Sequence, residues 1–176
     1  MHVKEAIERR RSIRKFADIS VPSALIQDLI EAARLAPSGS NAQPVRVFVV
    51  RSKETKELLK KARVFEQGFV CKAPTLLVIC GNPTVYGEGE TESLKGKNNE
   101  RCLRDLSIAS AFIILRATEL GLATCYVGLM DRHALRRVLK IPDEYMIPFV
   151  ICVGYSDEMP GRLRRKKCEE LILGGI

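Results

Sequence analysis

The sequence has no tryptophan, only two histidines, and no Cys-x-x-Cys pair among its six cysteines. His2 and His133 lie far from the cysteines in sequence, so the spacing typical of zinc sites is absent and we expect no metal site. No apolar run reaches the ~18 residues that a membrane-spanning helix requires, so we expect no membrane association. Six thiols fit a reducing compartment. Since the N-terminus starts an amphipathic helix without the apolar core of a signal peptide, we expect a cytoplasmic protein.

Aromatic residues are also scarce, at 6%, whereas the net charge is +8 and is unevenly distributed. Five basic residues lie in 9–15 and five more in 162–167. Neither cluster contains an aromatic pair on which bases could stack, which argues against nucleic acid as the partner. A small phosphate-bearing ligand held from both ends of the chain explains the distribution better. A basic module that binds nucleic acid or an acidic partner is the alternative.

The composition is that of an ordinary globular protein, with 46% hydrophobic and 28% charged residues. The length of 176 residues predicts one domain spanning 1–176. Apolar strand-like runs alternate with amphipathic segments, which predicts an α/β or α+β sandwich. We expect strands at 45–50, 75–80 and 147–155, and helices at 3–10, from Ser20 or Ser23 to Pro37, and at 53–63, 65–71, 99–120 and 131–140.

Two segments resist a simple assignment. Residues 122–129 are short and mixed, and residues 82–98 form the longest predicted loop, either a functional lid or a disordered segment.

The helix at 99–120 is apolar nearly all the way round over 108–115, and such a helix is buried on every face. In a domain of this size, full burial predicts that a partner subunit covers part of the helix.

Two short motifs carry the candidate chemistry. Residues 10–14 place three arginines and one serine in five positions, and a guanidinium presents a rigid fork of donors that matches a phosphate. Residues 37–44 carry no charge but are rich in amide, hydroxyl and backbone donors, on a path fixed by proline and glycine. The first motif could hold a phosphate, and the second could line the edge of a planar polar ring.

Taken in order, these motifs resemble the nitroreductase family of FMN flavoproteins, and the match spans nearly the whole chain. The resemblance implies an α+β fold, with a mostly antiparallel sheet flanked by helices, in an intertwined homodimer with two FMN sites at the subunit interface. It rests on the following series: Arg10-Arg11-Ser12-x-Arg14-x-Phe16, Ala36 to Pro44, Gly121 to Gly128, Gly154-Tyr155, and Arg162 to Glu170.

The resemblance also implies roles for single residues. The family's first basic positions and its serine bind the FMN phosphate and ribityl chain, and they match Arg10, Arg11 and Ser12. The basic residue two positions further reaches the pyrimidine edge of the flavin and matches Arg14. A fixed cation there would stabilise the negative charge of the reduced ring.

Other family contacts come from later segments. A loop matching Pro37, Ser38, Gly39 and Asn41 usually comes from the other subunit and contacts the ring and ribityl chain. A backbone N–H that points at flavin N5 matches Gly128, with Val127 before it. Candidates for further contacts are Gln67 at the ring, and Arg165 or, second to it, Arg164 at the phosphate.

The implied activity is transfer of hydride from NAD(P)H through flavin N5 to a small electron-poor acceptor such as a nitroaromatic, quinone or enone. No side-chain acid or base is required for it, so no catalytic side chain is expected. An FMN enzyme of the same fold with different chemistry, such as dehalogenation or ring cleavage, is an alternative. The chain departs from the family where many members have tryptophan after Gln-Pro, because Val45 stands there, and Tyr126 and Val127 precede Gly128 where tryptophan or glutamate is common.

Three polar or reactive residues near these segments are assigned structural roles. Cys125 is expected to be a small core thiol rather than a nucleophile, because nothing in the sequence would lower its pKa. Asp105 and Ser110 lie on the long helix and are expected to form interface hydrogen bonds rather than to catalyse.

Overall fold

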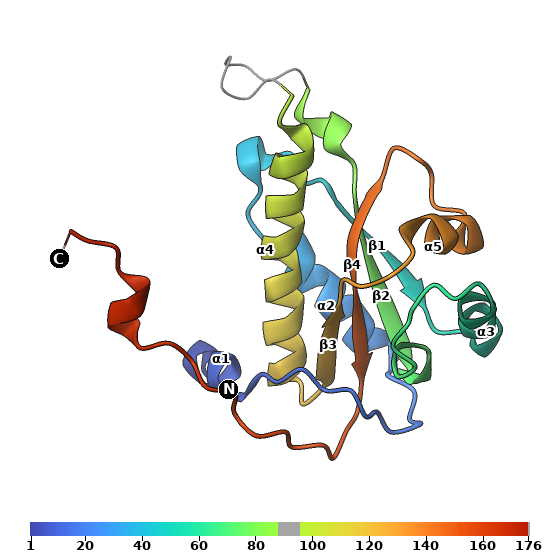
Figure 1. Cartoon of the computed structure of the whole chain (residues 1–176), viewed down its shortest axis with the longest axis horizontal. Coiled ribbons are helices and arrows are strands. Elements are labelled where there is room, and N and C mark those ends of the chain that lie inside the picture. Colours follow the sequence, from blue (N-terminus) through green and yellow to red (C-terminus); the bar gives the residue numbers. More distant parts are fainter. Residues whose placement is uncertain (88–95, 176) are drawn as a thin grey trace.

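The computed structural model describes residues 1–87 and 96–175 of the chain. Its centre is a four-stranded antiparallel sheet in the order β1-β2-β4-β3, flanked by helices (Figure 1). This confirms the predicted fold class. The three expected strands all form, and a fourth, β3, lies within the segment that the sequence left unassigned. The strands are β1 (Val45–Val50), β2 (Thr75–Gly81), β3 (Ala123–Val127) and β4 (Met146–Gly154).

The central strand β2 is buried along its whole length because β1 and β4 pair with its two edges. Its side chains alternate between the two faces of the sheet, as the pleat requires. Leu77 and Ile79 face one core, and Leu76 and Val78 face the other. β1 and β3 are the two edge strands of the sheet, and the candidate site lies along β3.

Two helices cover each face of the sheet (Figure 1). α2 (Ser23–Arg34) and α4 (Asn98–Glu119) pack together on one face, and α3 (Lys53–Lys61) and α5 (Arg132–Leu139) on the other. An ion pair between Asp28 and Arg116, with 2.6 Å between oxygen and nitrogen, joins α2 to α4.

Some predicted helix ends are confirmed and others are wrong. The Asp131 carboxylate caps α5 by accepting from the Ala134 N–H at 2.9 Å. Neither Ser20 nor Ser23 caps α2, which Pro22 precedes, because the Ser23 hydroxyl accepts a hydrogen bond from Arg51 instead. The helix predicted over 65–71 shrinks to a 3-10 turn, η2 (Val70–Lys72), because the run is short and contains a glycine.

The long segment predicted as a loop begins with a 3-10 turn, η3 (Pro83–Tyr86). Residues 88–95, on which the expectation of a lid or a disordered segment depends, lie outside the described residues. None of the helices formed by the described residues is long and apolar enough to cross a membrane.

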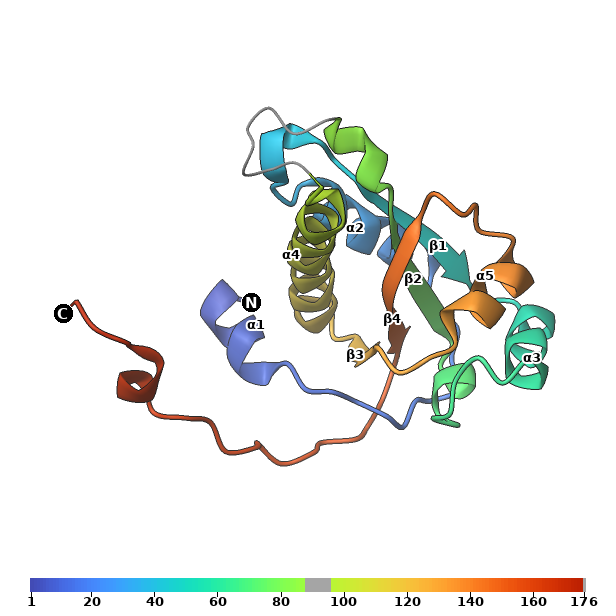
Figure 2. The same ribbon diagram turned by 45° about the horizontal axis from the view of Figure 1, so that its top comes forward.

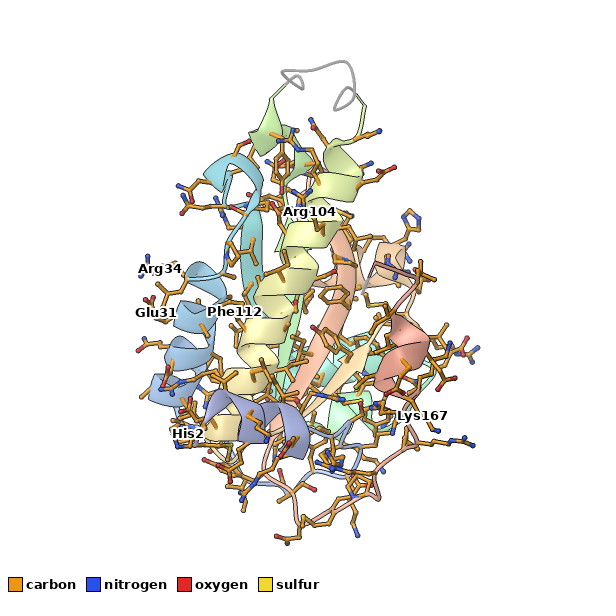
Figure 3. All side chains as sticks on the ribbon, turned by 90° about the vertical axis from the view of Figure 1, so that its left-hand side faces the viewer. His2, Glu31, Arg34, Arg104, Phe112 and Lys167 are labelled. Atoms are coloured by element: carbon orange, nitrogen blue, oxygen red, sulfur yellow. The ribbon has the colours of Figure 1, made fainter. Side chains whose placement is uncertain are left out.

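The burial of α4 is one-sided within a single chain. Its inner side is buried against the sheet and α2, but Leu103 and Phe112 are 42% and 41% exposed. Figure 3 faces this outer side, with Arg104 near the start of the helix and Phe112 near its middle. One chain alone therefore does not bury α4 on every face, and the cover expected from a partner subunit stays a prediction. An apolar side of α4 is left open.

Both ends of the chain lie outside the sandwich. α1 (Val3–Arg9) packs near α4, and residues 155–175 contain only one regular turn, η5 (Cys168–Leu171). Figures 1 and 2 both show this C-terminal tail leaving the body after β4 and ending away from the sheet. Every residue from 161 to 175 is exposed, so the tail packs only loosely on its own chain.

Candidate functional site

The first cationic motif is fixed along the free edge of β3. Ser12 forms a parallel bridge with Thr124, and the Ile13 N–H donates to the Thr124 carbonyl at 2.9 Å. Backbone pairing thus holds residues 10–14 in an extended path beside the last strand of the sheet. Three arginines are placed there by main-chain bonds that do not depend on their side chains.

Cations from both ends of the chain meet in one cleft. A cavity of about 510 Å³ is lined by Arg10, Arg11, Ser12 and Arg14, together with Arg162 and Arg165 of the tail. The Arg162 guanidinium also donates to the Glu8 carbonyl at 3.1 Å, which ties the tail to the end of α1. Arg164 does not line the cleft. A second cleft of about 610 Å³ adjoins the first, because both share Arg10, Arg11 and Arg162.

The Glu158 carboxylate holds the N-terminal cationic segment beside the chain that leads into the basic tail. Oε2 of Glu158 accepts hydrogen bonds from the backbone N–H groups of Arg14 at 2.9 Å and Lys15 at 3.0 Å. These two N–H groups hold the pKa of Glu158 below its ordinary value. The Ser156 hydroxyl adds a bond to the Lys15 carbonyl. Sequence reasoning missed Glu158, and the signal it offered was an acidic residue just before a strongly basic tail.

Gly128 follows β3 directly, and its N–H points away from the sheet. Thr124 uses its carbonyl for the N-terminal segment, and alternate residues of an antiparallel strand direct their N–H groups to the same edge. Tyr126 and Gly128 therefore face the edge that Ser12 occupies further back. Among the described residues no acceptor is found for the Gly128 N–H. Val127 is 1% exposed, so only its backbone is open to a ligand.

The second motif is a rigid loop at the other end of the molecule. The Gly39 N–H donates to Oδ2 of Asp105 at 2.7 Å, and the Gln43 N–H donates to the Ser38 hydroxyl at 2.9 Å. Ser40 and Asn41 both adopt left-handed backbone angles, with φ of 52°. Such conformations cost free energy in residues other than glycine and persist where the surroundings fix them. A mostly apolar cavity of about 250 Å³ lies beneath the loop.

Asp105 is the anchor of this loop, and sequence reasoning assigned it a different role. Its carboxylate is 2% exposed and also accepts from the Tyr86 hydroxyl at 2.7 Å and from Nε of Arg104 at 2.9 Å. Burial, aided by this carboxylate, raises the pKa of Tyr86 and keeps it a donor. Ser110 likewise donates within its own helix, to the Leu106 carbonyl. Both side chains thus form hydrogen bonds within the chain, and the expected interface bonds stay a prediction.

The two motifs do not meet within one chain. Asp105 holds the loop near the start of α4, whereas Thr118 lines the cationic region near its end. Asp105 and Thr118 are 13 positions apart on the helix, which is about 20 Å along the axis. Figure 1 shows the same separation, with α1 beside the end of α4 and the η1 turn (Gly39–Asn41) beside its start. Pro37, Ser38, Gly39 and Asn41 therefore lie apart from the arginine cleft.

Two other candidates, Gln67 and Cys125, do not line the arginine cleft. Gln67 is exposed in the turn before η2 and lines none of the three clefts described above. Cys125 is buried in the core, and this burial raises the pKa of its thiol, as expected for an inert core cysteine. Within residues 1–87 and 96–175 there is no group of three or more side chains that could hold a metal ion.

The fold and the site together define an α+β protein with a cation-lined cleft suited to a phosphate-bearing ligand at a sheet edge. The model of the nitroreductase family matches this chain over residues 7–67 and 58–155. The chain belongs to the nitroreductase family, and it is therefore an oxidoreductase.

Known relatives agree with this assignment. A Methanothermobacter thermautotrophicus protein provisionally named NADH dehydrogenase/NAD(P)H nitroreductase is 37% identical over 92% of this chain and 81% of its own length. The NADPH-flavin oxidoreductase of Vibrio harveyi is 29% identical over 89% of this chain and 66% of its own. The solved structure of an FMN-dependent nitroreductase from Clostridium difficile superposes with a TM-score of 0.72, at 29% identity, over 90% of each chain.

Proposed function

We propose that two copies of this chain form a homodimer that binds FMN at two interface sites and transfers hydride from NAD(P)H to a small electron-poor acceptor. Flavin and NAD(P)H names among the relatives support the general class of reaction. Nitroaromatics, quinones and enones are the acceptors we expect, in a ping-pong cycle. That residues 1–176 form one domain, and that the protein works in the cytoplasm, stay predictions.

The convergence of arginines from both chain ends on one cleft carries this proposal. FMN ends in a phosphate, and guanidinium–phosphate hydrogen bonds are among the stronger ones in proteins. Arg10, Arg11 and Arg165 face the cleft and would hold that phosphate, with the Ser12 hydroxyl as a further donor. The chemistry of these donors fits a dianionic group, and the cleft is large enough to admit more than a bare ion.

The edge of β3 supplies the donors for the ring. The Gly128 N–H, which has no acceptor in the described part of the chain, would donate to flavin N5. The Arg14 guanidinium would lie toward the pyrimidine side and stabilise negative charge there. When bound, FMN supplies the hydride acceptance and donation. The protein supplies orientation, N–H donors and fixed cations, and none of the residues facing the cleft has to act as an acid or base.

The distance between the two motifs supports a second chain. A loop held about 20 Å along α4 from the arginine cleft completes that cleft only if it comes from another copy. The open apolar side of α4, with Leu103 and Phe112, offers the surface for this contact. Pro37, Ser38, Gly39 and Asn41 of one subunit would then contact the flavin bound by the other.

The test is FMN affinity, measured by quenching of flavin fluorescence in the purified protein. Arg10→Ala and Arg165→Ala should each weaken binding by about 10- to 100-fold, since a hydrogen bond to a charged group contributes about 1.5–3 kcal/mol. Arg164→Ala and Arg137→Ala remove cations that do not line the cleft, and should change the affinity less than about threefold. A wild-type protein that takes up no FMN, or equal effects of all four changes, would refute the proposal.

A further inference from the structure

Arg132, the first residue of α5, holds together the point where the chain leaves the sheet. Its guanidinium donates to three backbone carbonyls: Nη2 to Gly128 at 3.1 Å and to Pro148 at 3.0 Å, and Nε to Ile147 at 3.0 Å. One of these carbonyls belongs to the residue that follows β3, and two belong to the start of β4. The side chain therefore spans both strands.

These carbonyls lie just beyond the last pair of the ladder. β3 and β4 pair from Ala123–Gly154 to Val127–Val150, and the pairing stops there. Past that point the two strands separate, and the guanidinium takes the place of the missing backbone donors. A planar fork can satisfy several carbonyls at fixed angles, which an ammonium group on a flexible stem does less well.

The segment that Arg132 holds is also fixed on its other side. The Asp131 N–H donates to the Val64 carbonyl at 2.9 Å, and Met130 is buried in the core. Gly128 itself has no such support, because a Cβ built on it would meet no atom within 4 Å. The Arg132 bond to its carbonyl restrains the peptide plane that follows Gly128, and the pairing of Val127 with Val150 restrains the plane that carries the Gly128 N–H.

We propose that Arg132 is a positioning residue: by clamping the chain just beyond the last ladder pair it holds the Val127–Gly128 peptide plane, and so sets the direction of the Gly128 N–H and the strength of its hydrogen bond to flavin N5. This inference rests on the proposed function, since it needs FMN beside the β3 edge. Arg132 acts through the Gly128 backbone and is not required to touch the cofactor. It is a member of neither cationic cluster, so its role differs from that of the phosphate-binding arginines.

Sulfite affinity of the FMN-loaded protein tests the proposal. Sulfite forms a bond from its sulfur lone pair to flavin N5, while the ring takes up the negative charge at its pyrimidine side, so affinity reports how strongly N5 is polarised. Arg132→Met should raise the dissociation constant for sulfite by about tenfold, the order expected when an aligned donor is lost or turned away. Arg132→Lys should give an intermediate value. Arg137→Met, an exposed change on the same helix, should leave it unchanged.

Hydrogen–deuterium exchange on the FMN-free protein provides the second readout. Arg132→Met should speed exchange in peptides that cover 124–130 and 147–150 by about tenfold, because the last ladder pair loses its clamp. If wild-type protein takes up no FMN, the proposed function fails, and the exchange result still decides whether Arg132 clamps the strands. If FMN binds but Arg132→Met holds sulfite within twofold of wild type, the positioning role is refuted. Should that variant not fold, Arg132→Lys decides by the same limits.

Discussion

Replacing Asp105 should uncouple the loop at 37–41 from the start of α4. In Asp105→Ala, the Gly39 N–H and the Tyr86 hydroxyl both lose their acceptor in a site where the carboxylate was 2% exposed. A buried donor left without a partner costs about 1–3 kcal/mol. The Arg104 side chain is about half exposed, so its pairing adds little. We expect a loss of about 3 kcal/mol in the free energy of unfolding.

Asp105→Asn separates the effect of the acceptor oxygen from that of the charge, because an amide oxygen can replace Oδ2. Both neutral donors keep an acceptor, while the amide nitrogen faces Nε of Arg104, so the loss should be about 1 kcal/mol. Glu100→Ala, an exposed change in the first turn of the same helix, should stay within about 0.5 kcal/mol of wild type.

The assay is urea unfolding of FMN-free protein, followed by circular dichroism at one fixed protein concentration. Removing FMN excludes stabilisation by the ligand, and the fixed concentration excludes differences in association. A loss below about 1 kcal/mol for Asp105→Ala would show that the loop keeps its shape without this carboxylate, and the anchoring argument would fail. Equal losses for the alanine and asparagine variants would show that the charge, not the acceptor oxygen, matters.

Further predictions concern the dimer, the pH response and the thiols. Phe112→Asp should convert a dimer to a monomer in light scattering after gel filtration, since burying a carboxylate is costly, whereas Leu58→Asp on the other face should not. Folding lowers the pKa of Glu158, so its contribution to stability is full above the unfolded value of 4.5 and is lost as pH falls through the lower folded value. Wild type and Glu158→Gln should therefore differ in unfolding free energy at pH 6 and converge in strong acid. Cys168 is exposed and should react fast with a thiol reagent, while Cys152, whose pKa burial raises, should react only on unfolding.

The sequence was informative wherever a local pattern decides structure. The run 75–80 is apolar and bounded by proline and glycine, and it forms the buried central strand. Asp131 is followed by an amphipathic segment, and it caps α5 as expected. In each case the sequence signal lies within a few residues: an apolar run between chain breakers marks the strand, and a capping side chain marks the start of the helix.

Other features depend on contacts distant in sequence, which a pattern does not reveal. β3 was missed because its segment is short and mixed, and it becomes a strand by pairing with β4 and Ser12. The same holds for Glu158, whose partners lie more than 140 residues away. The convergence of 10–14 with the tail was expected from charge alone, whereas the part played by Arg132 needed the three carbonyls that only the fold brings together.

The length of α4 has one more consequence. If the arginines of a flavin site come from one polypeptide and the loop from another, two inactive variants with defects in different motifs can complement each other. A mixture of chains damaged only at the arginines with chains damaged only at the loop would assemble hybrids in which one site carries both lesions and the other carries none. A mixture of the two inactive variants would therefore regain activity after unfolding and joint refolding. Each hybrid dimer would have one intact site out of two.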